Sequence, residues 1–218
     1  MDPLDGKGLL LLSGGFDSPV AGDLLKRKGV DLLALHFSYE PVTDDASVLK
    51  AIRLAQHAGI PKLFVVRAGD AFKEVVKRCR HKLYFVITKR LMMRVASEIA
   101  RRETCDSLIT GESLGQVSSQ TLRNLDVINR AATVPVLRPL IGFDKQEIID
   151  RAKGIGTYEI SVGPELCDIL GPKHPATQAR IEDVKQEEAR IDVAGLVAEM
   201  VGKTEVLEIA AKALEVTG

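Results

Sequence analysis

The chain has 218 residues, of which 45% are hydrophobic, enough for one filled core or for one core with a small appendage. Its 30 Lys and Arg residues balance 30 Asp and Glu residues, so no overall positive field is available to gather a polyanion. No apolar run approaches the roughly 18 residues that span a bilayer, and no signal segment opens the chain. We therefore expect a soluble cytoplasmic protein without membrane contact.

The cysteines and aromatic residues argue against three further kinds of framework or site. Cys79, Cys105 and Cys167 form no C-x-x-C pair, which argues against a disulfide framework and against a four-cysteine zinc site. Aromatic residues make up only 4% of the chain, which argues against a nucleic-acid platform of stacked rings.

Short apolar runs alternate with segments of helical period along most of the chain. This alternation is typical of βαβ units, and it predicts an α/β fold in which helices sandwich a parallel β-sheet. The expected strands span residues 8–12, 31–37, 62–66, 107–110 and 134–137. The expected helices span residues 18–28, 44–58, about 83–103, 120–130 and 145–153, the last with Asp144 as its N-cap.

The composition changes near the C-terminus, where Glu, Lys, Ala and Val dominate from Pro172 onward. We expect one domain over residues 1–175 and a mostly helical extension over residues 176–218 that packs on it. The extension also suits a docking or dimerisation arm. Residues 203–209 suit either a final edge strand or part of a helix, and the sequence leaves both open.

The first predicted strand runs directly into the segment Ser13-Gly14-Gly15-Phe16-Asp17-Ser18, which opens a helix. Glycines let backbone N–H groups approach a phosphate, the two serines add hydroxyl donors, and the helix N-terminus favours an anion. The segment lacks the lysine of a P-loop and does not match G-x-G-x-x-G. A carboxylate among phosphate-binding donors would repel the ligand, so Asp17 indicates a polyphosphate bridged by Mg²⁺.

The S-G-G-x-D-S sequence after a first strand resembles the PP-loop of ATP pyrophosphatases, which cleave ATP between its α and β phosphates and adenylate an acceptor oxygen. Further segments resemble the tRNA 4-thiouridine synthetase family, the ThiI type of tRNA sulfurtransferase linked to thiamine biosynthesis. The resemblance covers residues 8–178. It is carried by SGGFDSPVA at 13–21, LHF at 35–37, KRLM at 89–92, TGESLGQVSSQTLRNL at 110–125, PVLRPLIG at 135–142, and DK and IGT at 144–145 and 155–157.

The resemblance implies a reaction, with ATP and Mg²⁺ as cofactors. ATP adenylates the C4 oxygen of a tRNA uridine, at position eight in the family, and releases pyrophosphate. A persulfide or sulfide sulfur then displaces AMP. Family members usually carry a ferredoxin-like region and a THUMP domain that grips tRNA. We expect this chain to be the PP-loop domain alone, with a THUMP-type partner or a homodimer surface for tRNA and a separate persulfide sulfur donor protein.

The resemblance also assigns site residues. Lys145 corresponds to a lysine implicated in catalysis, where its charge would neutralise the α-phosphate, and Asp17 is both catalytic and a Mg²⁺ ligand. Cys167 corresponds to the sulfur-handling cysteine, with Lys173 or His174 placed to lower its pKa. The family's ATP-binding positions correspond to Leu11, Leu12, Ser13, Gly14, Gly15, Asp17, Ser18, His36, Phe37, Lys89, Gly111 and Gln120.

Several of these residues also have plainer interpretations. His36 suits a role through its backbone or in packing, Lys89 suits a solvated helix face, Lys145 suits an ordinary first helical turn, and Cys167 suits a structural thiol. The polar segment 111–120 suits either recognition of a base or ribose, or a turn that caps the next helix. The basic run over residues 77–94 suits either a phosphate track or a solvated helix face.

Two other functions remain open from the sequence. One is a PP-loop ligase that adenylates the carbonyl or carboxylate of a small molecule, and the other is a degenerate nucleotide sensor without catalysis. Some related enzymes hold an iron–sulfur cluster through a C-x-x-C before the K-R-L-M segment. Phe85 and Thr88 stand at those positions here, which argues against a cluster.

Overall fold

The computed structural model describes residues 6–163 and 169–210. Within these residues, six strands form one sheet in the order β5-β4-β1-β2-β3-β6. Neighbouring strands are parallel, except that β6 runs antiparallel to β3. The strands are β1 (Lys7–Leu11), β2 (Asp31–Ser38), β3 (Lys62–Arg67), β4 (Ser107–Ile109), β5 (Val136–Leu137) and β6 (Glu205–Glu208).

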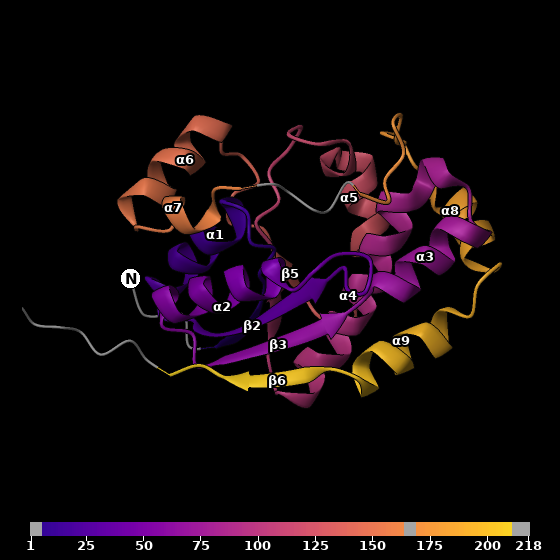
Figure 1. The fold of residues 1–218 in the computed structure, drawn as a ribbon. Helices are drawn as coiled ribbons and strands as arrows, with labels where there is room; N and C mark the ends of the chain where they lie inside the picture. Colours follow the sequence, from indigo (N-terminus) through magenta and orange to yellow (C-terminus); the bar gives the residue numbers. More distant parts are fainter. Residues whose placement is uncertain (1–5, 164–168, 211–218) are drawn as a thin grey trace, which may run out of the picture.

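Helices cover both faces of the sheet (Figure 1), which confirms the predicted α/β fold. One face carries α1 (Asp17–Lys26), α2 (Ala46–Ala58), α6 (Lys145–Gly154) and α7 (Tyr158–Ser161). The other carries α3 (Gly69–Arg78), α4 (Tyr84–Arg102), α5 (Leu122–Asn129), α8 (Ile181–Glu188) and α9 (Val193–Gly202). Short 3₁₀ helices, η1 (His81–Leu83) and η2 (Ser118–Gln120), precede α4 and α5. None of the helices described is both long and apolar enough to cross a membrane.

Alternation along the strands divides the apolar side chains between two clusters. Leu9 lies in the cluster beneath α4, whereas its neighbour Leu10 lies in the cluster beneath α1 and α2. Phe64 and Val65 of β3 divide in the same way, as expected for a strand whose successive side chains point to opposite faces. Burial on both faces explains why the strand segments read as continuous apolar runs.

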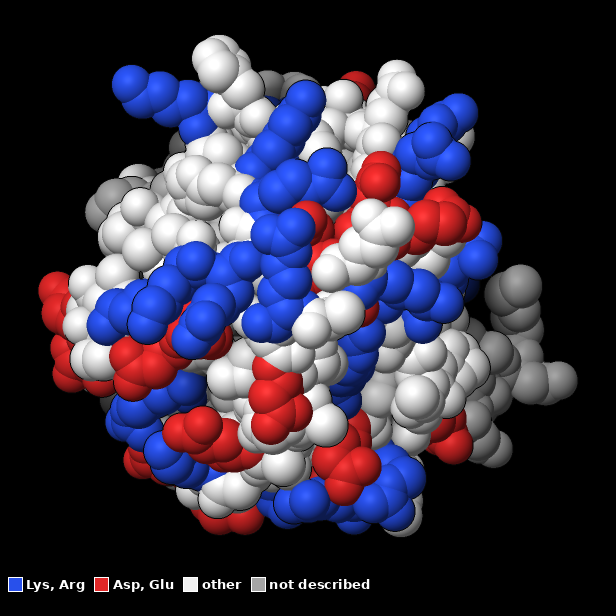
Figure 2. All heavy atoms as spheres, turned by 90° about the vertical axis from the view of Figure 1, so that its right-hand side faces the viewer, with Lys and Arg blue, Asp and Glu red and all other residues white. Residues whose placement is uncertain are grey.

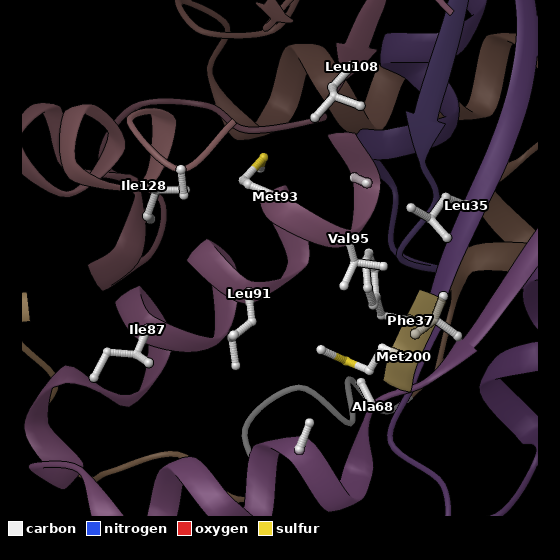
Figure 3. Close-up of a cluster of buried hydrophobic side chains, with 14 of the residues drawn as sticks. Leu35, Phe37, Ala68, Ile87, Leu91, Met93, Val95, Leu108, Ile128 and Met200 are labelled. Carbon is white, nitrogen blue, oxygen red and sulfur yellow. The ribbon is translucent and has the colours of Figure 1, made fainter. Parts of the chain in front are cut away.

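Helix α4 forms the centre of the larger cluster. Its side chains Leu91 and Val95 are fully buried. Figure 3 shows Val95 beside Phe37 of β2, with Met200 of α9 next to them, so helices from distant parts of the sequence meet over the sheet. Burying one leucine side chain such as Leu91 contributes roughly 2 kcal/mol to the free energy of unfolding.

Several predicted boundaries differ from the structure. The last parallel strand is only Val136–Leu137, because Pro135 has no N–H to donate to a ladder. The helix expected over 120–130 begins at Leu122, where the Thr121 hydroxyl caps the Asn124 N–H at 3.2 Å. Asp144 caps α6 as predicted, in a capping box with Glu147.

Two elements were missed or left open by the sequence analysis. Helix α3 was not predicted, although its buried Ala71, Phe72 and Val75 show the helical spacing that would have revealed it. Residues 205–208 form the edge strand β6, paired with β3, rather than a helix. Helices α8 and α9 precede it, and both lie in the segment that was expected to be mostly helical. The division into domains after residue 175 stays a prediction.

Candidate functional site

The predicted phosphate loop lies where the order of the sheet reverses direction. The chain proceeds from β1 outward through β2 to β3, and then returns to the other side of β1 for β4 and β5. Loops that leave the carboxyl ends of β1 and β4 therefore border a crevice at the switch point, which is where ligands bind in open α/β sheets. Residues 12–16 follow β1 and residues 110–117 follow β4.

The loop after β1 is held in shape by its two serines. Ser18 is buried, and its Oγ accepts a hydrogen bond from the Ser13 N–H at 3.1 Å and lies 3.3 Å from Ser13 Oγ. Gly14 has a φ of +89°, a conformation that glycine adopts without strain. Helix α1 lies entirely within the described residues, and no side chain there caps its start. Its first N–H groups therefore face the loop. Asp17 stands in that first turn. This arrangement suits a phosphate group.

Two elements that the sequence analysis did not assign to the site flank this loop. Lys50 of α2 lies beside Gly14, because a Cβ built on that glycine would be 3.2 Å from Lys50 Cδ. Lys50 Nζ donates to the Ser161 carbonyl at 3.3 Å, and Ser161 Oγ donates to the Gly15 carbonyl at 3.4 Å. The Phe16 ring stacks on Tyr158 with 5.2 Å between centroids. Helices α2 and α7 thus support the loop from the side, and only the tertiary fold could reveal this.

Gly111 joins the second loop to the first. A Cβ at this position would lie 2.6 Å from the Asp17 carbonyl carbon and 2.6 Å from the Ser18 nitrogen. The backbone after β4 therefore touches the start of α1 so closely that only glycine fits. The structure brings Gly111 together with Asp17 and Ser18, as the predicted site requires.

His36 is buried at 2% exposure and bonds to the end of the first strand. Its Nδ1 lies 2.8 Å from the Leu12 carbonyl and its Nε2 lies 3.1 Å from Ser47 Oγ. A carbonyl only accepts, so Nδ1 carries the proton and Nε2 accepts from the serine. Burial lowers the pKa of His36, while the bond to Leu12 and the charge of Glu40 oppose that shift. The neutral imidazole therefore holds the Leu12 carbonyl and Ser47 Oγ in place, and a role of His36 in ATP binding stays a prediction. Phe37 is buried in the cluster beneath α4.

A buried carboxylate that the sequence analysis did not single out lies next to Gly111. Glu112 is 6% exposed, and its Oε1 lies 2.9 Å from Lys89 Nζ while its Oε2 lies 2.8 Å from Arg138 Nε. Thr110 Oγ1 also donates to Oε2 at 3.2 Å. We term Glu112, Lys89 and Arg138 the Glu112 cluster. Burial raises the pKa of Glu112, but the charges and hydrogen bonds of the two cations outweigh it and hold the pKa at about 2.

Gln120 ends η2 and is also buried, at 8% exposure. Its Oε1 and the Nε2 of Gln116 are buried without a hydrogen-bond partner among the described residues. Such atoms are costly unless a ligand or a water satisfies them. The segment 111–120, for which the sequence left open either recognition of a base or ribose or a turn that caps the next helix, thus contains two buried polar atoms without a partner among the described residues.

The roles of the remaining predicted residues, Lys145 and Cys167, stay predictions. Lys145 is the exposed first residue of α6, which packs against α1. Cys167 lies outside the described residues. Cys79 and Cys105 are buried, and burial raises the pKa of each to about 11, so both stay as thiols near neutral pH.

The basic run over residues 77–94 does not form one phosphate track. Arg90 is buried and pairs with Glu188 at 2.8 Å, and Arg94 pairs with the same carboxylate at 2.8 Å. Arg80 pairs with Glu187 at 2.9 Å. On the face of the molecule at the right of Figure 1, Lys and Arg side chains are interspersed with Asp and Glu side chains, as Figure 2 shows. Arg90 and Arg94 lie on the buried side of α4, where Glu188 neutralises them.

Asp17 is the predicted metal ligand. Across the described residues, no group of three or more His, Cys, Asp or Glu side chains is arranged to hold a metal ion. Mg²⁺ commonly binds through one or two carboxylates together with substrate phosphates and water, so a single carboxylate beside a phosphate loop fits that use and does not fit an all-protein cage.

This chain is similar to proteins of a known family. The family model described as thiamine biosynthesis protein (ThiI) matches residues 4–193. The chain belongs to the ThiI family. A probable tRNA sulfurtransferase from Finegoldia magna is 44% identical over 210 residues, covering 94% of this chain and 54% of that protein. One from Nocardia farcinica is 45% identical over 208 residues. This ThiI-family chain spans about half the length of the curated relatives it matches.

Solved structures agree with this membership. The crystal structure of a 4-thiouridine synthetase in complex with RNA and with bound ATP superposes with a TM-score of 0.89 at 39% identity, covering 94% of this chain and 55% of that chain. The NH₃-dependent NAD synthetase of Campylobacter jejuni has a TM-score of 0.53 at 16% identity, which shows the fold alone.

Proposed function

We propose that this chain is the catalytic domain of a tRNA sulfurtransferase, which uses ATP to convert a uridine of tRNA into 4-thiouridine. The observation that carries the proposal is the meeting of two loops at the switch point, where Gly111 brings the polar segment 111–120 against the start of α1. The relatives' names and the ATP and RNA of the 4-thiouridine synthetase structure support the same chemistry.

In the first step, the C4 oxygen of the uridine attacks the α-phosphorus of ATP, and pyrophosphate leaves. The N–H groups at the start of α1 and the hydroxyls of Ser13 and Ser18 would bind the departing phosphates and stabilise their charge. Asp17 would hold Mg²⁺, which screens that charge when bound. Lys145, on the helix packed against α1, is the proposed cation for the α-phosphate.

The second step replaces AMP by sulfur. The outer sulfur of a persulfide attacks C4, the C4–O bond breaks, and AMP leaves with that oxygen. The Cys167 thiolate would then attack the inner sulfur of the persulfide, so that the S–S bond breaks, the outer sulfur stays on C4, and Cys167 and the donor cysteine are left as a disulfide. Cys167 is the proposed sulfur-handling thiol, by its resemblance to the family position. Capture of the tRNA by a THUMP-type region, by a partner or by a homodimer surface, and supply of sulfur by a separate persulfide protein, belong to the same proposal.

The two steps can be measured separately. We expect pyrophosphate release from ATP and Mg²⁺ to rise when unmodified tRNA is added, and Asp17→Asn to lose most of that release. Cys167→Ser should keep tRNA-dependent release but lose sulfur incorporation into RNA from a persulfide donor. Cys79→Ser is the matched control, because its buried, protonated thiol has no proposed role in sulfur transfer.

The contrary results are equally defined. Release that ignores tRNA but rises with a small carbonyl or carboxylate compound would assign the chain to the small-molecule ligases. Unchanged ATP turnover in Asp17→Asn would remove the catalytic assignment of the phosphate loop. Full sulfur incorporation in Cys167→Ser would remove the role of that thiol.

A further inference from the structure

The Glu112 cluster holds more positive than negative charge. Its single carboxylate is shared by Lys89 and Arg138, whose side chains are 25% and 14% exposed. Among the described residues, neither cation has another carboxylate partner within 4.0 Å. One carboxylate neutralises one cation, so an excess positive charge remains in a place with little water. A poorly solvated charge of this kind favours the binding of an anion beside it.

Arg138 also has a hydrogen-bond donor without an acceptor among the described residues. Its Nε bonds to Glu112 and its Nη1 donates to Asn129 Oδ1 at 3.1 Å. Its Nη2 is buried and has no hydrogen-bond partner in the described part of the chain. A buried donor without an acceptor is costly, so it indicates an acceptor supplied from outside the protein. Together with the excess charge, this makes an anionic oxygen the best match.

The location of the cluster identifies that anion. Arg138 directly follows β5, and Glu112 follows β4 by three residues, at the same edge of the sheet as the phosphate loop. Gly111, the neighbour of Glu112, touches the backbone of Asp17 and Ser18. The cluster is therefore continuous with the loop that is built to hold a polyphosphate.

Glu112 itself does not suit proton transfer. Lys89 and Arg138 hold its pKa at about 2, and a carboxylate so well paired is a poor base near neutral pH. Its bonds to Lys89, Arg138 and Thr110 instead determine where the two cations lie. Glu112 is thus a positioning residue.

We propose that Arg138, held in place by Glu112, binds a phosphoryl oxygen of ATP through its Nη2, beside Lys89. The inference rests on the proposed function for the identity of the ligand, and it adds a binding residue that the family resemblance did not assign. The planar guanidinium matters, because a fork with fixed donors matches a phosphoryl group better than a point charge does.

The test compares Arg138→Met and Arg138→Lys with the unaltered 218-residue chain. Titration calorimetry would measure the affinity for ATP, for adenosine, and for unmodified tRNA. We expect Arg138→Met to lower the affinity for ATP by about tenfold or more, because a hydrogen bond to a charged group is lost. The affinity for adenosine should not change. Arg138→Lys should recover part of the loss. Arg130→Met is the matched control, because Arg130 is exposed and pairs only with Asp126 among the described residues.

Other results would overturn the inference. Unchanged ATP affinity in Arg138→Met would show that Nη2 binds no phosphate of ATP. An equal loss for adenosine and ATP in a folded Arg138→Lys would show a purely structural role. A loss for RNA alone would assign the contact to the RNA backbone. If the unaltered chain binds ATP through Arg138 but pyrophosphate release rises with a small carbonyl or carboxylate compound and not with tRNA, the proposed function fails and the phosphate contact stands.

Discussion

Single residues at this site act mainly by holding other groups in place. His36 fixes the end of β1 from inside the protein, and its neutral ring matches the hydrogen bonds to Leu12 and Ser47. Glu112 does the same for two cations, but as a permanent anion. One group must stay uncharged and the other must stay charged, so the two make the stability of the fold depend on pH in different ranges.

The pH dependence of His36 has a definite sign. Its pKa is lowered in the folded protein, so below about pH 6.5 the unfolded chain binds more protons and the free energy of unfolding falls as the pH falls. Between pH 7.5 and 5.5 we expect His36 to account for a loss of at most about 1.4 kcal/mol, measured by urea unfolding. Glu112, whose pKa is lowered to about 2, loses its contribution only below about pH 4.5.

His36→Gln should remove this part of the slope, because glutamine does not titrate. His57→Gln is the control, since His57 is an exposed histidine on α2 and His36 remains in that variant. An equal slope in His36→Gln and in the unaltered protein would contradict the assignment.

At the scale of elements, the contact between the end of β4 and the start of α1 decides whether the two loops form one site. Gly111→Ala would place a Cβ 2.6 Å from backbone atoms of Asp17 and Ser18, so one element must shift. We expect a loss of about 1–3 kcal/mol in the free energy of unfolding and weaker ATP binding. Chemical denaturation and nucleotide titration would measure both.

Gly154→Ala is the matched control for that substitution. It ends α6, and a Cβ built there meets no atom of the described residues within 4 Å. Alanine favours helix over glycine, so we expect unchanged binding and unchanged or slightly higher stability. Full stability and full ATP affinity in Gly111→Ala would refute the close contact.

For the whole molecule, the C-terminal segment is joined to helix α4 by charge as well as by apolar packing. Glu188 of α8 is buried and bonds with Arg90 at 2.8 and 3.0 Å and with Arg94 at 2.8 and 2.9 Å. Burial raises the pKa of Glu188, but hydrogen bonds from the two arginines outweigh it and lower the pKa. The strand β6 then extends the sheet beyond β3.

Glu188→Gln should therefore destabilise the whole fold. The substitution leaves the buried guanidinium of Arg90 without its counter-ion, which costs about 3–5 kcal/mol in the free energy of unfolding. Thermal and urea unfolding would measure this loss. Glu98→Gln is the control, because Glu98 pairs with Arg101 and Arg102 on the surface of α4, the helix that carries Arg90. We expect little change in the free energy of unfolding for this variant. Equal stabilities of the two variants would show that the buried pair does not join the segment to the core.

Local patterns in the sequence determined the phosphate loop, the alternation of strands and helices, and the cap at Asp144. Each of these features depends on residues that are neighbours along the chain, so spacing alone reveals it. Helix α3 also depends on residues that are neighbours along the chain, since its buried side chains follow a helical spacing.

Only the tertiary structure decided the rest, because its contacts join residues that are far apart in the chain. Lys89 and Arg138 are 23 and 26 residues from Glu112, and Lys50 is 111 residues from Ser161. The spacing of these residues carries no signal that they meet. The same reason left residues 205–208 ambiguous, since their strand conformation depends on pairing with β3, which lies more than 130 residues earlier.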